Sequence, residues 1–447
     1  MRELFGTDGV RGIANKDLTV HLCLRIARAA ATVLRRQGDG RPCVVVGRDT
    51  RISGDMIEAA MIAGFCSAGA DVIPVGVLPT AGVAYLARVL DVDMGAVISA
   101  SHNPYEFNGI KFFSHLGFKL PDAVEQEIES RVNSSQHLDH PTGDGLGRQL
   151  PAGDAVARYR EYLRGLCPVS LRGMKLVVDC AHGAVAALGP ALFRELGAEV
   201  IAINDAPDGL NINTDCGATH PEVVAGAVRE AGAHAGLTFD GDADRLLLAD
   251  ETGRVVDGDH IMAIAAGALA ARGRLPGGLV VGTVMSNLGL ERALARQGMR
   301  LVRANVGDRY VLEEMQRRGS MLGGEQSGHV IFLDHATTGD GLVTALVILQ
   351  ILREAEMPLS ALAGAMDVYP QKLVNVTVPS PKGWEEREPI RRAIHDAECD
   401  LGDEGRVLVR ASGTEPKVRV MVEAQQAEKV ERWTEHIARV IEEQLAA

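Results

Sequence analysis

The sequence predicts an α/β fold of three related α/β domains with mostly parallel mixed sheets, followed by a smaller C-terminal α+β domain. Two observations carry this prediction. A strand–helix–strand unit occurs three times, and such units form parallel sheets with helices on both faces. The units are separated by roughly 100 to 130 residues, which favours separate domains of ordinary size over one large doubly wound sheet.

The repeated unit has the same parts each time. It opens with a short Val-rich run, which is typical of a parallel strand, and continues through a loop into a helix-like stretch. A glycine then ends the helix, and a second apolar strand follows. The units start at Cys43, Lys175 and Leu279, and their second strands are expected at Asp71–Ile73, Glu199–Ile201 and Arg300–Val302.

The last part of the chain breaks this pattern. KLVNVTVPS alternates as a strand should, GRVLVR and KVRVMVEA are two strands that flank ASGTEP, and EEREPIRRAIHDA and EKVERWTEHIARVIEEQL are helical. Because these strands are neighbours in sequence, this part forms a small α+β domain. We expect domains at residues 1–153, 154–253, 254–366 and 367–447.

Composition excludes several classes of protein. The 447 residues are 46% hydrophobic and 23% charged, which is ordinary for a globular chain. A net charge of −13 argues against nucleic acid and anionic membranes as partners. The longest apolar runs, His260–Ala271 and Gly341–Leu352, are too short to span a membrane, and no secretory signal is expected. Seven scattered cysteines without a CxxC pair suit buried thiols in a reducing cytoplasm.

The loop ISASHNPYEFNGIKFF places polar side chains between two apolar runs. Gly95–Ser99 is expected to be a buried strand, and Ile110–Phe113 starts another apolar run. The polar residues between them cannot be core, and loops on a rigid scaffold often carry chemistry. Ser101 is therefore a candidate nucleophile, expected to be exposed.

An acidic loop, FDGDADR, lies between two expected strands. Asp240, Asp242 and Asp244 crowd like charges at alternate positions and need a compensating cation. Oxygen ligands of this kind suit Mg²⁺. An EF-hand is excluded because Arg245 occupies the position that needs glycine. Enzymes that transfer phosphoryl groups commonly place a metal ion beside an arginine. The simpler alternative for this loop is a solvated acidic turn.

Other polar loops leave two interpretations open. FGTDGVRG fits either phosphate binding or a simple surface turn, and GRDTRISG fits either a site or a local salt-bridged turn. VGDRYV fits either a structural or a functional role. GGEQSGH offers carboxylate and hydroxyl partners for sugar hydroxyls, or forms an ordinary hairpin turn. The residues concerned are Thr7, Asp8 and Arg11, then Arg48, Asp49, Arg51 and Ser53, then Asp308 and Arg309, and finally Glu325, Ser327 and His329.

The loop RASGTEPKVR in the last domain gathers groups that suit a phosphate. Arginine forks, hydroxyls and free backbone N–H groups match a phosphate dianion, and a charged hairpin is the alternative. The density of such groups in one short loop favours phosphate binding. They are Arg410, Ser412, Gly413, Thr414, Lys417 and Arg419.

Taken together, these loops resemble those of the α-D-phosphohexomutase superfamily over almost the whole chain and in the same order. SASHNP with NGIK resembles its phosphoserine loop, DGDADR its metal-binding loop, GGEQSGH its sugar-binding loop and RASGTEPKVR its phosphate-binding loop. The resemblance implies four domains around a central cleft. The segments FGTDGVRG, GGEQSGH and SGTEP are similar to those of the superfamily members that act on amino-sugar phosphates.

The resemblance also implies roles for individual residues. Ser101 would carry the phosphoryl group, and its phosphate would join the three aspartates as the fourth ligand of Mg²⁺. Lys111 and His329 are candidates for proton transfer and charge stabilisation, with Arg11 and Arg245 beside the reacting phosphate. The implied substrate-binding residues are Thr7, His102, Asp308, Arg309, Glu325, Ser327, Arg410, Ser412, Gly413, Thr414 and Arg419.

The implied reaction converts glucosamine 6-phosphate to glucosamine 1-phosphate through phosphorylated Ser101 and a glucosamine 1,6-bisphosphate intermediate. It would supply UDP-N-acetylglucosamine and cell-wall synthesis in the cytoplasm. The partner is then a phosphorylated amino sugar, with no nucleic acid and no membrane, and a homodimer stays open.

Three rival functions are weighed against this one. A serine hydrolase would use Ser101 and His102, but the sequence has no GxSxG elbow, and a residue next to the nucleophile cannot easily turn to serve as its base. A non-catalytic sugar-phosphate sensor would not need both the serine and the acidic loop. A sister mutase acting on glucose or mannose phosphates stays the main alternative.

Overall fold

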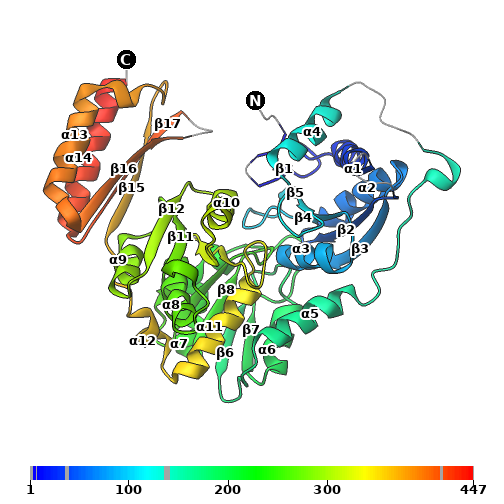
Figure 1. The fold of residues 1–447 in the computed structure, drawn as a ribbon, viewed down its shortest axis with the longest axis horizontal. Coiled ribbons are helices and arrows are strands. Elements are labelled where there is room, and N and C mark those ends of the chain that lie inside the picture. Colours follow the sequence, from blue (N-terminus) through cyan, green and yellow to red (C-terminus); the bar gives the residue numbers. More distant parts are fainter. Residues whose placement is uncertain (1–3, 7, 36–39, 135–140, 413–415, 446–447) are drawn as a thin grey trace.

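A computed structural model describes residues 4–6, 8–35, 40–134, 141–412 and 416–445 of the chain (Figure 1). Thr7, Gly413 and Thr414, which the sequence analysis assigned to ligand loops, lie outside these residues. The described chain forms four sheets with their covering helices, in the order of the sequence.

The first sheet is mixed, with the strand order β1-β5-β4-β2-β3. Strand β2 pairs in parallel with β3 and β4, whereas β5 is antiparallel to β4 and β1. The elements are β1 (Val10–Ile13), α1 (Val20–Arg35), β2 (Cys43–Arg48), α2 (Gly54–Ser67), β3 (Asp71–Val77), α3 (Thr80–Val89), β4 (Met94–Ile98), β5 (Phe107–Ser114) and α4 (Asp122–Asn133).

The second sheet repeats this design, with the order β10-β9-β8-β6-β7. Strand β6 is parallel to β7 and β8, and β9 is antiparallel to β8 and β10. The elements are α5 (Ala155–Leu166), β6 (Lys175–Asp179), α6 (Leu188–Glu195), β7 (Glu199–Ile203), α7 (Pro221–Ala231), β8 (Ala235–Phe239), β9 (Leu246–Asp250) and β10 (Val255–Val256).

The third sheet has the order β12-β11-β13-β14, and only the β13–β14 pair is antiparallel. Its elements are α8 (Gly258–Ala271), β11 (Leu279–Thr283), α9 (Leu288–Arg296), β12 (Arg300–Ala304), α10 (Asp308–Arg318), β13 (Leu322–Gly324), β14 (Val330–Phe332), α11 (Gly341–Ala355) and α12 (Leu359–Ala363).

The C-terminal sheet is antiparallel throughout, with the order β15-β17-β16. Figure 1 shows α13 and α14 together on one face of it. The elements are β15 (Gln371–Thr377), α13 (Glu388–Leu401), β16 (Gly405–Ala411), β17 (Lys417–Ala424) and α14 (Ala427–Leu445).

The predicted fold class is confirmed. The opening and second strands of all three repeated units pair in parallel, as β2–β3, β6–β7 and β11–β12. The glycines that end the helices, Gly69, Gly197 and Gly298, have φ of 85°, 102° and 72°, a left-handed conformation that glycine adopts without steric cost.

The packing of the core explains the long apolar runs. They form most of α8 and α11, whose side chains belong to one cluster of buried apolar residues that extends through the first three domains. Among the described residues, no helix combines the length and the apolar character that crossing a membrane would need. All seven cysteines are free, but Cys399 is exposed, so the expectation of buried thiols is wrong there.

One topological feature positions the site. In each α/β domain a strand of the parallel part turns back into an antiparallel strand, at β4–β5, β8–β9 and β13–β14. These three connections carry the serine loop, the acidic loop and the GGEQSGH loop respectively. The three loops singled out in the sequence therefore occupy equivalent places in three related sheets.

Candidate active site

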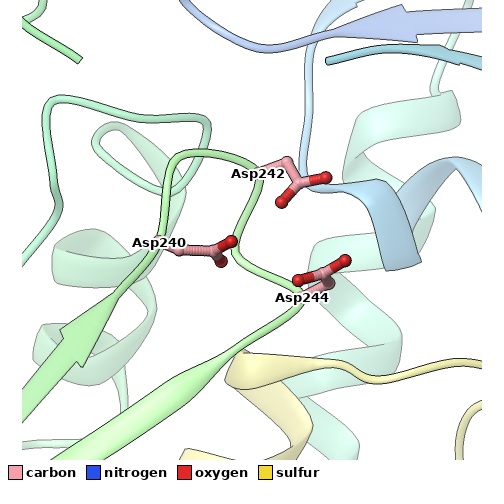
Figure 2. A group of neighbouring side chains, drawn as sticks. All are labelled: Asp240, Asp242 and Asp244. Carbon is pink, nitrogen blue, oxygen red and sulfur yellow. The ribbon is translucent and has the colours of Figure 1, made fainter. Parts of the chain in front are cut away.

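The acidic loop between β8 and β9 is a candidate metal centre. Asp240, Asp242 and Asp244 are buried, and one carboxylate oxygen of each lies within 4.8 Å of the others. In Figure 2 the three carboxylates surround a shared space. Among the described residues, Oδ1 of Asp242 and Oδ1 of Asp244 have no hydrogen-bond partner. Buried, crowded oxygen atoms of this kind fit a hard cation such as Mg²⁺.

The electrostatics of the three aspartates differ. Burial, followed by the charges of Asp244 and Asp242, raises the pKa of Asp240 well above its ordinary value. Burial and the charge of Asp242 also raise the pKa of Asp244. Burial opposes ionisation of Asp242 as well, but Lys111 and the hydroxyl of Thr80 lower its pKa. A bound cation would remove the mutual repulsion that raises the first two.

Ser101 lies against this loop from the first domain. Its Oγ donates to Asp240 Oδ2 at 2.6 Å and lies 3.3 Å from Nδ1 of His102. The expectation of an exposed serine is wrong, because Ser101 is only 1% exposed. The β4–β5 connection packs against the acidic loop of the second domain, and Ser101 lies in the wall of an open cavity.

Lys111, on β5, is the buried cation of the centre. Its Nζ lies 2.9 Å from Asp242 Oδ2, 3.4 Å from Asp244 Oδ2 and 3.0 Å from Asp8 Oδ2. Burial acts to lower the pKa of Lys111, but Asp242, Asp8 and Asp244 raise it well above its ordinary value. Lys111 is therefore held protonated in this arrangement and supplies charge to the site.

A second group of charges joins the first domain to the third. Arg11 donates to Asp8 and, at 3.5 Å, to the carbonyl of Ala100, beside Ser101. Lys119 bridges Asp8 and Asp308, which starts α10 of the third domain. Residues far apart in sequence are thus fixed beside one another at the entrance to the centre.

The GGEQSGH loop closes the cavity from the third domain. Glu325 Oε1 accepts from the backbone N–H of Gly307 at 2.8 Å, and Ser327 Oγ lies 3.5 Å from Glu325 Oε2. His329 is 3% exposed, and its Nε2 lies 3.7 Å from Asp308 Oδ2. Among the described residues, neither ring nitrogen of His329 has a hydrogen-bond partner.

Beside these groups lies a cavity of about 540 Å³ that residues of three domains line. Arg245 lies at its wall, with its backbone N–H on Asp240 Oδ1 at 3.2 Å. The cations Arg11 and Arg245 in this lining belong to the first two domains, and the carboxylates of Asp308 and Glu325 belong to the third. The lining residues are Leu4, Phe5, Gly6, Asp8, Gly9, Arg11, Ser101, His102, Asp244, Arg245, Val306, Gly307, Asp308, Glu325 and His329.

Some predicted substrate-binding residues lie elsewhere. Arg309 contacts the carbonyl of Leu120 and the carboxylates of Asp122 and Glu125, so it ties α10 to the first domain. Arg410 and Arg419 are direct neighbours across the β16–β17 ladder. The described residues of the C-terminal domain, which include both arginines and Ser412, contribute nothing to the lining of the cavity.

Sequence reasoning missed Thr80 and Lys119. Thr80, at the start of α3, donates its hydroxyl to Asp242 Oδ2 at 2.6 Å and its backbone N–H to the carbonyl of Asp242 at 3.0 Å. Neither residue belongs to a loop rich in polar groups, so the local pattern gave no signal. Their roles depend on how separate domains pack.

Comparison with known families matches all four parts of the chain. The models of phosphoglucomutase/phosphomannomutase α/β/α domains I, II and III match residues 2–139, 157–253 and 257–369. The model of the phosphoglucomutase/phosphomannomutase C-terminal domain matches residues 373–440.

Curated relatives cover the whole chain. The phosphoglucosamine mutase of Thermoanaerobacter sp. (strain X514) is 53% identical over 447 residues, which is 100% of both chains. The phosphoglucosamine mutase of Symbiobacterium thermophilum is also 53% identical, again over 100% of both chains. That of Desulforamulus reducens is 51% identical over 99% of both.

Solved structures share the architecture. A phosphoglucomutase/phosphomannomutase family protein from Burkholderia thailandensis is 28% identical, with a TM-score of 0.82 over 98% of this chain and 97% of that one. The N-acetylphosphoglucosamine mutase of Aspergillus fumigatus, solved with GlcNAc-6P and magnesium, has a TM-score of 0.70 over 100% and 96% of the two chains. At 18% identity, the latter shows the fold alone.

Proposed function

Because the chain belongs to the phosphoglucomutase/phosphomannomutase family, we propose that it is a mutase that interconverts glucosamine 6-phosphate and glucosamine 1-phosphate. The observation that carries this proposal is the 2.6 Å contact between Ser101 Oγ and Asp240, beside a cavity of sugar-phosphate size. It joins a nucleophile to a candidate metal centre, as phosphoryl transfer through the protein requires.

Ser101 is the proposed carrier of the phosphoryl group. Phosphorylated Ser101 donates its group to the C1 hydroxyl of glucosamine 6-phosphate, and the bisphosphate then returns its 6-phosphate to Ser101. Asp240, Asp242 and Asp244 would hold Mg²⁺, with an oxygen of the Ser101 phosphate as a further ligand. When bound, the ion would neutralise the charge that develops on the transferring group.

Three cations of the protein support the same step. Arg11 and Arg245 line the cavity together with Ser101, and Lys111 lies on Asp242 and Asp244 of the acidic loop. A transferring phosphoryl group carries charge on three oxygens, and fixed donors in a buried site stabilise that charge more strongly than water does. Lys111 contributes as a cation, because its raised pKa makes it a poor proton acceptor near neutral pH.

His329 is the proposed proton-transfer group. It lines the cavity, and its ring nitrogens make no hydrogen bond to other described residues. A side chain that accepts the C1 hydroxyl proton must lie within hydrogen-bond reach of the sugar, and His329 projects from the same loop as Glu325. Glu325 and Ser327 are the proposed partners of the ring hydroxyls.

The second phosphate of the ligand is assigned to the C-terminal domain. Arg410 and Arg419 place two guanidinium groups side by side, and burial together with the charge of Arg419 lowers the pKa of Arg410. An anion between them would relieve this repulsion. The described residues of this domain do not line the cavity, so the two arginines would bind the end of the ligand that lies away from Ser101.

The amino sugar is the proposed substrate class, and the cytoplasm is the proposed location. The curated relatives named phosphoglucosamine mutase support the first, and seven free cysteines support the second. The test is kcat/KM on glucosamine, glucose, mannose and N-acetylglucosamine phosphates under one set of conditions. Glucosamine phosphate should be preferred, with measurable activity on glucose phosphate. Faster turnover of glucose or mannose phosphate would make the enzyme a sister mutase.

A further inference from the structure

One buried arginine holds the loop that carries Ser101. Arg51 lies between β2 and α2 and is 1% exposed. Its Nη2 donates to the carbonyls of Ser101 at 2.9 Å and Asn103 at 2.8 Å. Its Nη1 donates to the carbonyls of Pro104 and, at 3.1 Å, Phe107.

Every N–H of the Arg51 guanidinium is used. A guanidinium has five donors in a rigid fork, and the fifth, on Nε, binds Asp49 Oδ2 at 2.9 Å. Four of the five acceptors are backbone carbonyls of one short loop, so the arginine fixes the path of that loop. Burying a charge is costly unless it is paired and fully hydrogen-bonded, and Asp49 supplies the pair.

The loop needs such support because Ser101 adopts an unfavourable conformation. Its φ is 53°, in the left-handed region, which costs a residue with a Cβ roughly 1–2 kcal/mol. This conformation aims Oγ at Asp240. The neighbouring Ser99 hydroxyl accepts from the N–H of Ser101 at 2.9 Å and donates to Asp49, so the same ion pair also fixes the other side of the serine.

The second domain supports the loop from the opposite side. Nδ2 of Asn213 donates to the carbonyl of Ser101 at 2.9 Å and to that of Asn103 at 3.1 Å, the same two atoms that Arg51 Nη2 contacts. Gly241 of the acidic loop approaches so closely that a Cβ there would lie 2.7 Å from the carbonyl oxygen of Ser101. The serine loop is therefore enclosed between two domains.

We propose that Arg51, assisted by Asn213, is a positioning residue for phosphoryl transfer: it holds the backbone of Ser101 so that Oγ points at the acidic loop. This inference rests on the proposed role of Ser101 as phosphoryl carrier. Arg51 does not touch the cavity, so its loss should slow the chemical step without weakening the binding of the sugar phosphate.

The test compares Arg51→Lys with Arg48→Lys. Lysine keeps the charge beside Asp49 but offers three donors in place of five, so some loop carbonyls lose their partner. Arg48, in the same GRDTR segment, contacts Asp55 and Glu58 and no carbonyl of the serine loop. A displacement of about 1 Å can cost roughly 100-fold in rate. Per folded molecule, Arg51→Lys should therefore lose about 100-fold in kcat with KM within threefold, and Arg48→Lys should match the wild type.

Two further measurements distinguish a positioning role of Arg51 from a loss of stability. The rate at which glucosamine 1,6-bisphosphate phosphorylates Ser101 should fall in parallel with kcat, which lower stability alone would not produce. Should Arg51→Lys fail to fold, Asn213→Gly, which tolerates the φ of 58° at that position, should lose about tenfold in kcat at unchanged KM. If Arg51→Lys folds, a wild-type kcat in that variant would overturn the inference. If it does not fold, a wild-type kcat in Asn213→Gly would do so. An unphosphorylated, inactive wild type would instead overturn the proposed function.

Discussion

The first three domains differ from the C-terminal domain in how they pack against their neighbours. The first three share one buried apolar cluster, and charged side chains cross their boundaries, as Lys111 does to Asp242 and Lys119 to Asp308. The C-terminal domain has its own apolar cluster and adjoins the third domain, as Figure 1 shows near α9. Its junction is polar: Arg406 bonds to Glu423 and to the carbonyls of Val284 and Ser286.

This difference indicates a division of labour. The groups proposed to handle the reacting phosphate are fixed in place by packing among three domains. The pair of arginines proposed for the other phosphate is carried by a separately packed body. Substitutions in the first region should therefore act mainly on the chemical step, and substitutions in the second on binding.

The largest effect is expected from Ser101→Ala. Loss of the proposed phosphoryl carrier should reduce kcat by at least about 1,000-fold, because alanine has no hydroxyl to take the group. The melting temperature should stay close to that of the wild type. Ser67→Ala, at the end of α2, is the matched control and should be fully active. Full activity in Ser101→Ala would refute the mechanism.

Asp242→Asn should have the next largest effect. It removes one ligand charge and weakens the pairing with Lys111, so Mg²⁺ affinity, measured by calorimetry, should fall at least about tenfold and kcat with it. Sugar-phosphate binding should change little. Chelation of the wild type should mimic the substitution, with recovery on adding Mg²⁺. Turnover that resists chelators would show that the acidic loop is structural.

A smaller loss is expected in the other region. Arg419→Ala removes a charge-assisted contact worth about 1.5–3 kcal/mol, so KM should rise about tenfold or more. Since remote binding energy also orients the reacting end, kcat should fall as well, but less. The control is Arg432→Ala on α14, where the side chain pairs with Asp400 and lies over the ring of Trp433, both in the C-terminal domain. Unchanged kcat/KM in Arg419→Ala would place the second phosphate elsewhere.

The smallest effect concerns the junction and its pH dependence. Asp259 accepts the N–H of Asn287 at 2.7 Å, and Asn287 binds the backbone of Tyr369. Burial, with the charge of Asp257, raises the pKa of Asp259 to about 7. Since the folded pKa lies above the unfolded one, the protonated carboxyl stabilises the fold fully below about pH 4, and this contribution is lost as pH rises through 7.

Asp259→Asn should therefore gain melting temperature relative to the wild type as pH rises from 5 to 8, by several degrees. The exposed Asp367, which pairs with Arg296 at the same junction, supplies the control Asp367→Asn. A constant difference in melting temperature between Asp259→Asn and the wild type across this range would contradict the titration of Asp259 near pH 7.

The sequence was sufficient for features that depend on local pattern. Val-rich runs and the glycines that end helices predicted the parallel pairs, and the spacing of Asp240, Asp242 and Asp244 predicted the candidate metal centre. It was not sufficient where domains meet. The bridge from Asp8 through Lys119 to Asp308 joins residues that are 111 and 189 positions apart, and no local pattern encodes that docking.

The same limit explains the error on Ser101. A polar loop between apolar runs is ordinarily exposed, but here a loop of another domain lies over it, so the serine is buried against Asp240. The two interpretations of GRDTRISG stayed open in the sequence for the same reason. The segment is a salt-bridged turn, through Arg51 and Asp49, and that turn also holds the serine loop.

The most direct test follows the phosphoryl group itself. Protein labelled with ³²P on Ser101 is mixed with glucosamine 6-phosphate in a single turnover with Mg²⁺ present. The label should leave Ser101, as peptide mapping would show, and appear on C1 of the bisphosphate. It should then stay on C1 of glucosamine 1-phosphate, because the unlabelled 6-phosphate is the group that returns to Ser101. Label that stays on the protein while the sugar is converted would contradict transfer through Ser101.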